Sequence, residues 1–445
     1  MNLMTPIRRP LRQWRRLPLI SPRLWVRRVI FWGGAMLVSV MSIALARGAD
    51  MAQGVFNWML DGHQALAFVI CPAGLAICVY LTRRFFPGSQ GSGIPQAMAA
   101  LHLHDPRQID GLLSMRIAIG KFFLTLLGFV AGASIGREGP TVQVGSSILY
   151  AVGRALRLPR EETLRALILA GGAAGIAGAF NTPLAGVVFA IEEMSHSFES
   201  RTSGTVLTAV IIGGATTLVL AGNYTYFGST SALLTVATGW LPVLACAVVA
   251  GMLGGLFSRI LIDVPARLPA RFGRILMHRP ILFAALCGLL IALIGWAAGG
   301  QTFGAGYGQA RGMVEGHGLM PPAYPLLKLL ATAISYLSGI PGGIFAPSLS
   351  VGAGIAAWFA PLFPAVPPAA LVLLTMVSYF SGVVQAPITA AVIVMEMTNN
   401  QQMVVPLMAA SAIAFVASRL VCRRPLYAVL AGRFLRVMDH GTTHE

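Results

Sequence analysis

Three short motifs combine glycine with proline inside apolar sequence, and their pattern suits the binding of an anion. They read Gly91-Ser-Gly-Ile-Pro95, Gly136-Arg-Glu-Gly-Pro140 and Gly342-Gly-Ile-Phe-Ala-Pro347. Each pattern predicts unwound backbone followed by a helix, because proline fits the first turn, where N–H groups have no intrahelical acceptor. Those N–H groups and the positive end of the helix dipole point at whatever precedes the helix. We therefore expect three helix starts to converge on one anion.

Glu138 lies inside the second motif, at the expected helix start. A carboxylate there is itself an anion, so it can occupy the position that a bound anion would use. When it is protonated it loses that attraction and leaves. Protons and anions then compete for one site, which is the basis of an exchange mechanism. The alternative role is a helix cap, but an acidic residue deep in apolar sequence is more often functional.

The composition identifies the surroundings of these motifs as a membrane. The chain has 445 residues, of which 56% are hydrophobic and only 11% are charged, whereas soluble domains carry about 25% charged residues. This excludes a soluble enzyme, a disordered protein and a nucleic-acid binder. The formal net charge of +17 comes from 32 basic and 15 acidic residues. The arginines cluster between apolar spans, as the positive-inside rule expects, so no nucleic-acid partner is predicted.

Uncharged stretches and basic clusters predict the topology. Residues 202–258 and 329–395 contain no charged side chain, so each must hold more than one membrane helix. The basic clusters predict a multi-pass protein of the cell inner membrane with both termini in the cytoplasm. We expect a basic cytoplasmic segment over 1–28, one transport domain over 29–436 and a short tail over 437–445.

The chain contains an internal repeat. Residues 181–192 match 385–396 at a spacing of 204 positions, and residues 136–145 match 343–352 at a spacing of 207. Two matches in the same order at nearly one spacing indicate two halves of common design, about 29–225 and 240–436. Repeats with broken helices are typical of secondary transporters, whose site lies near the membrane midplane between the halves.

The motif set, together with a late tyrosine in Pro425-Leu-Tyr427, resembles the CLC family of chloride channels and proton-coupled chloride exchangers. The resemblance covers nearly the whole chain. It implies an all-α polytopic membrane protein with two inverted-topology repeats of tilted and broken helices. It also implies a homodimer with a separate path for chloride in each subunit.

The resemblance assigns roles to individual residues. Ser92 and Tyr427 would donate hydroxyl hydrogen bonds to the central chloride, joined by the backbone N–H groups of Ile344 and Phe345. Glu138 would be the gating glutamate. Supporting positions implied by the same motifs are Gly91, Gly93, Pro95, Lys121, Arg137, Gly139 and Pro140. No metal ligand set and no cofactor are predicted.

Glu193 matches the family's internal proton-transfer glutamate, which passive channels of the family usually lack. Glu192 precedes it, and adjacent helical side chains point about 100° apart, so only one of the two can face the same path. Glu193 is the main reason to prefer an exchanger to a channel. Gln96 departs from the glutamate that many exchangers carry after the first motif, so the resemblance implies one different polar contact within the same class.

The sequence therefore predicts a secondary active transporter that exchanges chloride for protons. A passive, voltage- or pH-gated chloride channel of the same fold is the alternative. A remote alternative is a membrane-embedded hydrolase, because Gly132-Ala-Ser134-Ile-Gly136 fits the G-x-S-x-G nucleophile pattern. No strand precedes that motif and no Asp or His partner is evident. Instead, glycine at 128, 132 and 136 predicts a closely packed membrane helix there.

Overall fold

The computed structural model describes residues 22–156, 161–195, 200–222, 225–234, 240–267 and 278–441. Most of the predicted basic segment 1–28 and the end of the 437–445 tail lie outside these residues. The described part is helical, with two isolated β-bridges. The first half contains α2 (Pro22–Leu60), η1 (Gln64–Leu66), α3 (Ala67–Phe85), α4 (Ile94–His102), α5 (Pro106–Leu113), α6 (Met115–Val130), α7 (Glu138–Ala155), α8 (Glu161–Phe180), α9 (Pro183–Phe189), η2 (Ala190–Ser195) and α10 (Ser200–Ala221).

The second half repeats this alternation of long and short helices. It contains α11 (Leu241–Arg267), α13 (Pro280–Ala297), α14 (Tyr307–Val314), α15 (Tyr324–Leu337), α16 (Phe345–Phe359), α17 (Pro368–Val384), α18 (Pro387–Thr398), α19 (Val404–Val421) and α20 (Leu426–Gly441). Within the described residues, seven helices are long and apolar enough to cross a membrane. Others, such as α4, α9 and α18, are too short to span it and begin or end inside the protein. The predicted fold of broken helices is confirmed.

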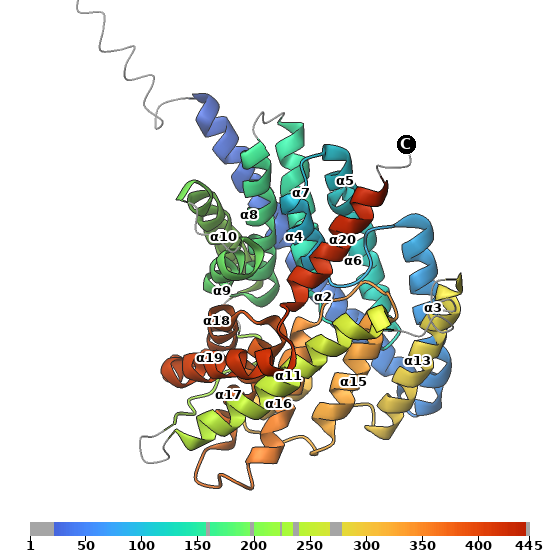
Figure 1. Ribbon diagram of the computed structural model, residues 1–445, viewed down its shortest axis with the longest axis vertical. Helices are drawn as coiled ribbons and strands as arrows, with labels where there is room; N and C mark the ends of the chain where they lie inside the picture. Colours follow the sequence, from blue (N-terminus) through green and yellow to red (C-terminus); the bar gives the residue numbers. More distant parts are fainter. Residues whose placement is uncertain are drawn as a thin grey trace, which may run out of the picture.

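The helices are arranged in three zones (Figure 1). Helices α3 and α13 pack together at one edge, and α9, α10, α18 and α19 form the opposite edge. Between the two edges lie α7, α16 and α17, whose side chains are almost all buried. The first of the three motif helices, α4, packs against both α7 and the C-terminal α20. The least exposed part of the molecule is thus the part that carries the predicted motifs.

The expected glycine-spaced helix over residues 128–136 is wrong. Helix α6 ends at Val130, and the chain then turns at Gly132, whose φ of +72° lies in the left-handed region that favours glycine. A Cβ atom at this position would also collide with the ring of Phe56. Gly136 lies beyond the turn, in one of the two β-bridges. These glycines shape a loop that leads into α7, and they do not form one packed helical stripe.

The matched helices α9 and α18 run antiparallel, as inverted repeats require. A glutamate lies at the end of each of these helix segments and accepts hydrogen bonds from two backbone N–H groups at the start of the other helix. Glu192 follows α9 and bonds to the start of α18, whereas Glu396 lies near the end of α18 and bonds to the start of α9. These are charge-assisted helix caps. The donors to Glu192 are Ile388 (3.1 Å) and Thr389 (2.6 Å), and the donors to Glu396 are Leu184 (3.2 Å) and Ala185 (2.7 Å).

Candidate functional site

Backbone hydrogen bonds join the three motif loops. Gly91 N–H donates to the Ile340 carbonyl at 3.1 Å, and the Gly91 carbonyl accepts from Gly342 N–H at 3.0 Å. Gly136 and Gly343 exchange two hydrogen bonds of 2.7 Å. The starts of α4, α7 and α16 therefore meet at one place, although they lie up to 251 positions apart in the sequence. The helix starts thus converge as the motifs predict, and the anion site between them stays a prediction.

Glycine is required where these helix starts touch. Gly93, with φ of +107°, lies so close to the first turn of α7 that a Cβ atom would come within 2.9 Å of the Gln143 Cβ. A Cβ atom on Gly343 would come within 3.0 Å of the backbone nitrogen of Gly139. These contacts explain why the motifs contain glycine at Gly93 and Gly343. Pro95 and Pro140 lie in the first turns of α4 and α7, where no N–H donor is lost.

Two polar side chains hold the loop before Ser92 in place. Lys121 on α6 is fully buried, and its Nζ donates to the carbonyls of Ser89 (2.8 Å) and Gly91 (2.5 Å). Gln96 closes the same loop, because its Oε1 accepts from Gly93 N–H at 3.1 Å and its Nε2 donates to the Gln90 carbonyl at 2.5 Å. A lysine that snorkels to the membrane surface is therefore excluded for Lys121.

Ser92 and Tyr427 present buried hydroxyl groups near the junction. Their exposed fractions are 1% and 0%, and Tyr427 reaches the site from the start of α20. The two side chains neighbour each other. Yet neither hydroxyl makes a hydrogen bond of normal geometry to any group in the described part of the chain. Buried hydroxyls without partners are uncommon and costly, so this pair is suited to donate to an acceptor that binds between them.

The start of α16 supplies backbone donors and an aromatic wall. Ile344 is the N-cap of this helix and Phe345 its first residue, so both lie among the N–H groups without intrahelical acceptors. The Phe345 ring contacts the rings of Phe380 (4.8 Å between centroids), Tyr427 (5.8 Å) and Phe189 (5.9 Å). The site therefore combines partial positive charge with apolar walls.

The Glu138 carboxylate extends from the start of α7 to the start of α16. The residue is completely buried. Its Oε2 accepts from Ala346 N–H at 3.4 Å, and its Oε1 accepts from the hydroxyl of Tyr307. The negatively charged group thus lies against the positive end of the second-half helix, where an anion would bind. Tyr307 belongs to no motif, and sequence reasoning missed it.

The Arg137 guanidinium is directed away from the anion position. It pairs with Asp50 at 2.8 Å, donates to the Ala46 carbonyl, and lies over the rings of Tyr226 (4.7 Å) and Tyr307 (4.9 Å). These groups line a cavity of about 640 Å³ that also contains Arg47 and Arg311. Arg137 thus lines this cavity, where its charge is paired with the Asp50 carboxylate.

Glu192 and Glu193 point in different directions, as the helical geometry predicts. The helix changes from α to π geometry over Ala190–Ser195, a rare form that is frequent at functional sites. Glu192 caps α18, whereas Glu193 is only 3% exposed and lies within electrostatic range of Tyr427. Glu193 is therefore the member of the pair that faces the interior.

Lys328 on α15 repeats the role of Lys121 and was also missed. It lies 207 positions after Lys121, which is the spacing of the repeated motifs, so the repeat itself was the available signal. It is fully buried, and its Nζ donates to the carbonyls of Thr302 (2.9 Å) and Gly304 (2.6 Å). Each half of the molecule thus uses one buried lysine to hold a loop.

The surroundings of Ser134 do not support a hydrolase. Its Oγ hydrogen bonds with Thr332 Oγ1 at 2.9 Å, and its backbone N–H donates to Ser335 Oγ at 3.0 Å. A serine nucleophile needs an adjacent base to take its proton, and these neighbours are hydroxyl groups. Ser134 joins the loop before α7 to α15, which is a packing role.

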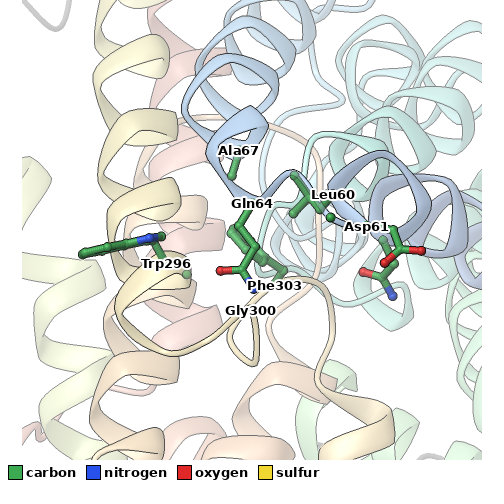
Figure 2. Close-up of a pocket in the computed structure, with 10 residues that line it drawn as sticks. Leu60, Asp61, Gln64, Ala67, Trp296, Gly300 and Phe303 are labelled. Atoms are coloured by element: carbon green, nitrogen blue, oxygen red, sulfur yellow. The ribbon is translucent and has the colours of Figure 1, made fainter.

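A second cavity lies apart from these residues. It has a volume of about 470 Å³. Figure 2 shows residues that line it, among them Leu60, Asp61, Gln64, Ala67, Trp296, Gly300 and Phe303. None of the residues predicted from the sequence to bind chloride or carry protons lines it.

Comparison with known proteins gives consistent matches along the chain. The family described as voltage gated chloride channel matches residues 74–419. The chain is 31% identical over 427 residues to the H(+)/Cl(-) exchange transporter ClcA of Yersinia pestis bv. Antiqua (strain Angola), covering 90% of this chain and 86% of that protein. The protein of the same name from Yersinia pseudotuberculosis serotype O:3 (strain YPIII) gives the same identity and coverage.

Solved structures agree with this match. A slow cyanobacterial Cl⁻/H⁺ antiporter superimposes with a TM-score of 0.77 at 26% identity, over 92% of this chain and 99% of that one. A CLC-type fluoride/proton antiporter gives the same TM-score and coverage at 21% identity, which shows a shared fold alone.

Proposed function

The chain belongs to the CLC family of voltage-gated chloride channels and exchangers, and from this membership we propose that it exchanges chloride for protons as a secondary active transporter. The family also makes it a multi-pass transport protein and not an enzyme. The observation that carries the proposal is the Glu138 carboxylate at the start of α16, beside the unpartnered hydroxyls of Ser92 and Tyr427. A carboxylate in an anion site makes protons and chloride competitors.

The anion half of the cycle follows from the donors at the site. Chloride would be held by the N–H groups of Ile344 and Phe345 and by the hydroxyls of Ser92 and Tyr427. All four are neutral donors, so they replace part of the hydration of chloride without a full positive charge. Binding is then strong enough to desolvate the ion and weak enough to release it.

The proton half of the cycle uses the two buried glutamates. Chloride that enters the site displaces Glu138, and protonation stabilises the displaced side chain because the neutral acid is no longer attracted to the helix start. Glu193, which is buried within electrostatic range of Tyr427, would exchange protons with the cytoplasm and pass them toward Glu138. One proton must therefore move whenever Glu138 leaves and returns, which couples the two fluxes.

We place transport in residues 29–436, with both termini in the cytoplasm of a bacterial-type cell and the basic clusters facing inward. We also propose a homodimer that meets through the α9, α10, α18 and α19 edge. Glu192 and Glu396 are only partly buried on that edge, and carboxylates facing lipid are costly. A second copy would cover them.

Reconstitution into vesicles tests the proposal. With a chloride gradient imposed and no initial proton gradient, an exchanger moves protons against the gradient that builds up. Chloride movement without protons would instead identify the passive channel. If neither ion moves in protein that remains folded, the transport proposal fails.

A further inference from the structure

We propose that Tyr307 is a positioning residue that latches the Glu138 carboxylate in the anion site and so sets the chloride concentration needed to open it. This inference rests on the proposed exchange function. The phenolic hydroxyl of Tyr307 donates to Glu138 Oε1, while Oε2 faces the start of α16. The two oxygens are therefore held from two different elements of the second half.

Hydrogen bonds from neighbouring helices fix the backbone segment that leads to Tyr307. We define the strap as residues 298–306, which join α13 to α14 and end at Gly306 with φ of +81°. Lys328 Nζ donates to the Gly304 carbonyl at 2.6 Å, and Ser350 Oγ donates to the Gly306 carbonyl at 3.0 Å. Tyr324 and Ser350 join their hydroxyls at 2.6 Å, which orients the serine.

The strap is also packed by its apolar side chain. The Phe303 ring meets the Phe56 ring at 4.9 Å between centroids and borders the cavity in Figure 2. Held at Phe303, Gly304 and Gly306, the strap gives α14 a defined start, so the Tyr307 side chain has little conformational freedom to lose when it bonds to Glu138. A hydrogen bond made by a preorganised donor contributes more than one made by a mobile side chain.

The Tyr307 ring is held in a fixed orientation. Its centroid lies 4.3 Å from the Tyr226 ring, 5.5 Å from the Phe227 ring and 4.9 Å from the Arg137 guanidinium. Arg137 is in turn fixed by Asp50. A cation over the ring withdraws electron density and makes the phenol a better donor to a carboxylate. Tyr307 therefore lies between the cavity that Arg137 lines and Glu138, with its hydroxyl directed at the carboxylate.

The latch distinguishes the two protonation states of Glu138. A phenol donates strongly to a carboxylate and much more weakly to a neutral acid. It thus stabilises the state in which Glu138 occupies the anion site, which is the state that chloride must displace. Tyr307→Phe keeps the ring and its packing but removes the donor. We expect the chloride concentration for half-maximal flux to fall roughly tenfold, as loss of one charge-assisted hydrogen bond predicts, with maximal flux within about twofold of wild type.

The decisive measurement repeats Tyr307→Phe in a protein that has no carboxylate at position 138. Full-length protein in vesicles is assayed as wild type, Tyr307→Phe, Glu138→Ala and the double variant. In the Glu138→Ala background, Tyr307→Phe should leave half-saturation unchanged. Tyr379→Phe is the matched control, because it also removes a buried tyrosine hydroxyl, one without a hydrogen-bond partner among the described residues, and it should leave half-saturation unchanged.

An equal shift in both backgrounds would overturn the latch, because the hydroxyl would then act on the protein and not on Glu138. No shift in the wild-type background would also overturn it. If Tyr307→Phe protein does not stay folded, Ser350→Ala loosens the strap and should give a smaller shift in the same direction, again only when Glu138 is present. Failure of the exchange function is distinguishable, since proton coupling that survives in Glu138→Ala contradicts that function whatever Tyr307 does.

Discussion

The two halves share their scaffold but not their chemistry. Lys121 and Lys328 each hold a loop, and Glu192 and Glu396 each cap the helix of the other half. At the repeat spacings, however, Glu138 corresponds to Phe345, and Glu193 corresponds to Met397. Both acids of the proposed proton path thus belong to the first half. The two halves thus share a symmetric frame and differ at the positions on which the proposed function rests.

Electrostatics explains why the asymmetry is useful. A glutamate at position 345 would bring a second carboxylate to the junction where Glu138 already lies against α16. Two carboxylates that share a site cannot both stay ionised without strong repulsion, and together they would exclude chloride. With Phe345, the second half instead offers free N–H groups beside an aromatic wall. In the proposed mechanism, the first half provides the carboxylate that moves and the second half provides the helix start that binds it.

The largest expected effect tests this division directly. Glu138→Gln should abolish proton movement while chloride flux continues, because the amide resembles the protonated acid in shape and cannot carry the proton. The measurement is simultaneous chloride and proton flux from the same vesicles. Proton pumping at the wild-type stoichiometry would show that Glu138 is not the coupling residue.

A slightly smaller effect is expected at the second acid. Glu193→Gln should stop proton transport and leave chloride flux, since this residue lies on the proton branch only. Glu192→Gln is the matched control one position away, and it should keep coupled exchange because Glu192 caps α18 outside the path. The opposite pattern, in which Glu192→Gln loses proton coupling and Glu193→Gln keeps it, would show that Glu192 carries the proton and Glu193 does not.

Much of the site could be predicted because its parts are local. A proline in a first turn and a glycine before it are readable from a few adjacent residues, and they marked the starts of α4, α7 and α16. The repeat spacing then indicated that the motifs belong to one symmetric frame. The different directions of Glu192 and Glu193 follow from helical geometry alone.

Other parts depend on contacts between distant segments. Tyr307 meets Glu138 across 169 positions, and nothing in the residues around Tyr307 reports that contact. The spacing of Gly128, Gly132 and Gly136 suggested a helix, but a turn forms because Gly132 packs beneath Phe56. Lys328 was predictable in principle, since it repeats Lys121. The repeat spacing therefore predicts matching residues that the motifs alone do not identify.

Ser92→Pro should change selectivity without ending transport. It removes a hydroxyl donor that has no other partner among the described residues. Loss of one good hydrogen bond to a charged ligand costs about 1.5–3 kcal/mol, or roughly tenfold to a hundredfold in chloride affinity. Nitrate is less strongly hydrated and needs the donor less, so preference should shift toward nitrate.

Anion competition in reconstituted protein measures that shift. Ser92→Ala is the matched control, because it removes the hydroxyl and leaves the backbone unrestricted, and it should weaken chloride in the same direction. If both variants keep the wild-type chloride-to-nitrate ratio, Ser92 is a packing hydroxyl and the central site lies elsewhere.

The smallest expected effect concerns the symmetric part of the frame. Glu192→Gln and Glu396→Gln each remove the charge from a cap and leave one oxygen to accept a hydrogen bond. Each should cost about 1 kcal/mol of stability, the usual value of a helix cap. In a protein of this size that is on the order of 1–3 °C in the thermal midpoint, measured in detergent. Coupled exchange should persist in both.

The comparison between these two variants is more informative than either alone. Because α9 and α18 are antiparallel, the caps lie at opposite ends of a helix pair, and the 12 residues of α18 correspond to about 18 Å. At that separation the two losses should be equal and additive in the double variant. A clearly larger loss at Glu192 would show that the π-helical turn beside it is the weaker structure, because α18 has no such turn. The two halves would then differ in stability at the π-helical turn that carries Glu193, a residue of the proposed proton path.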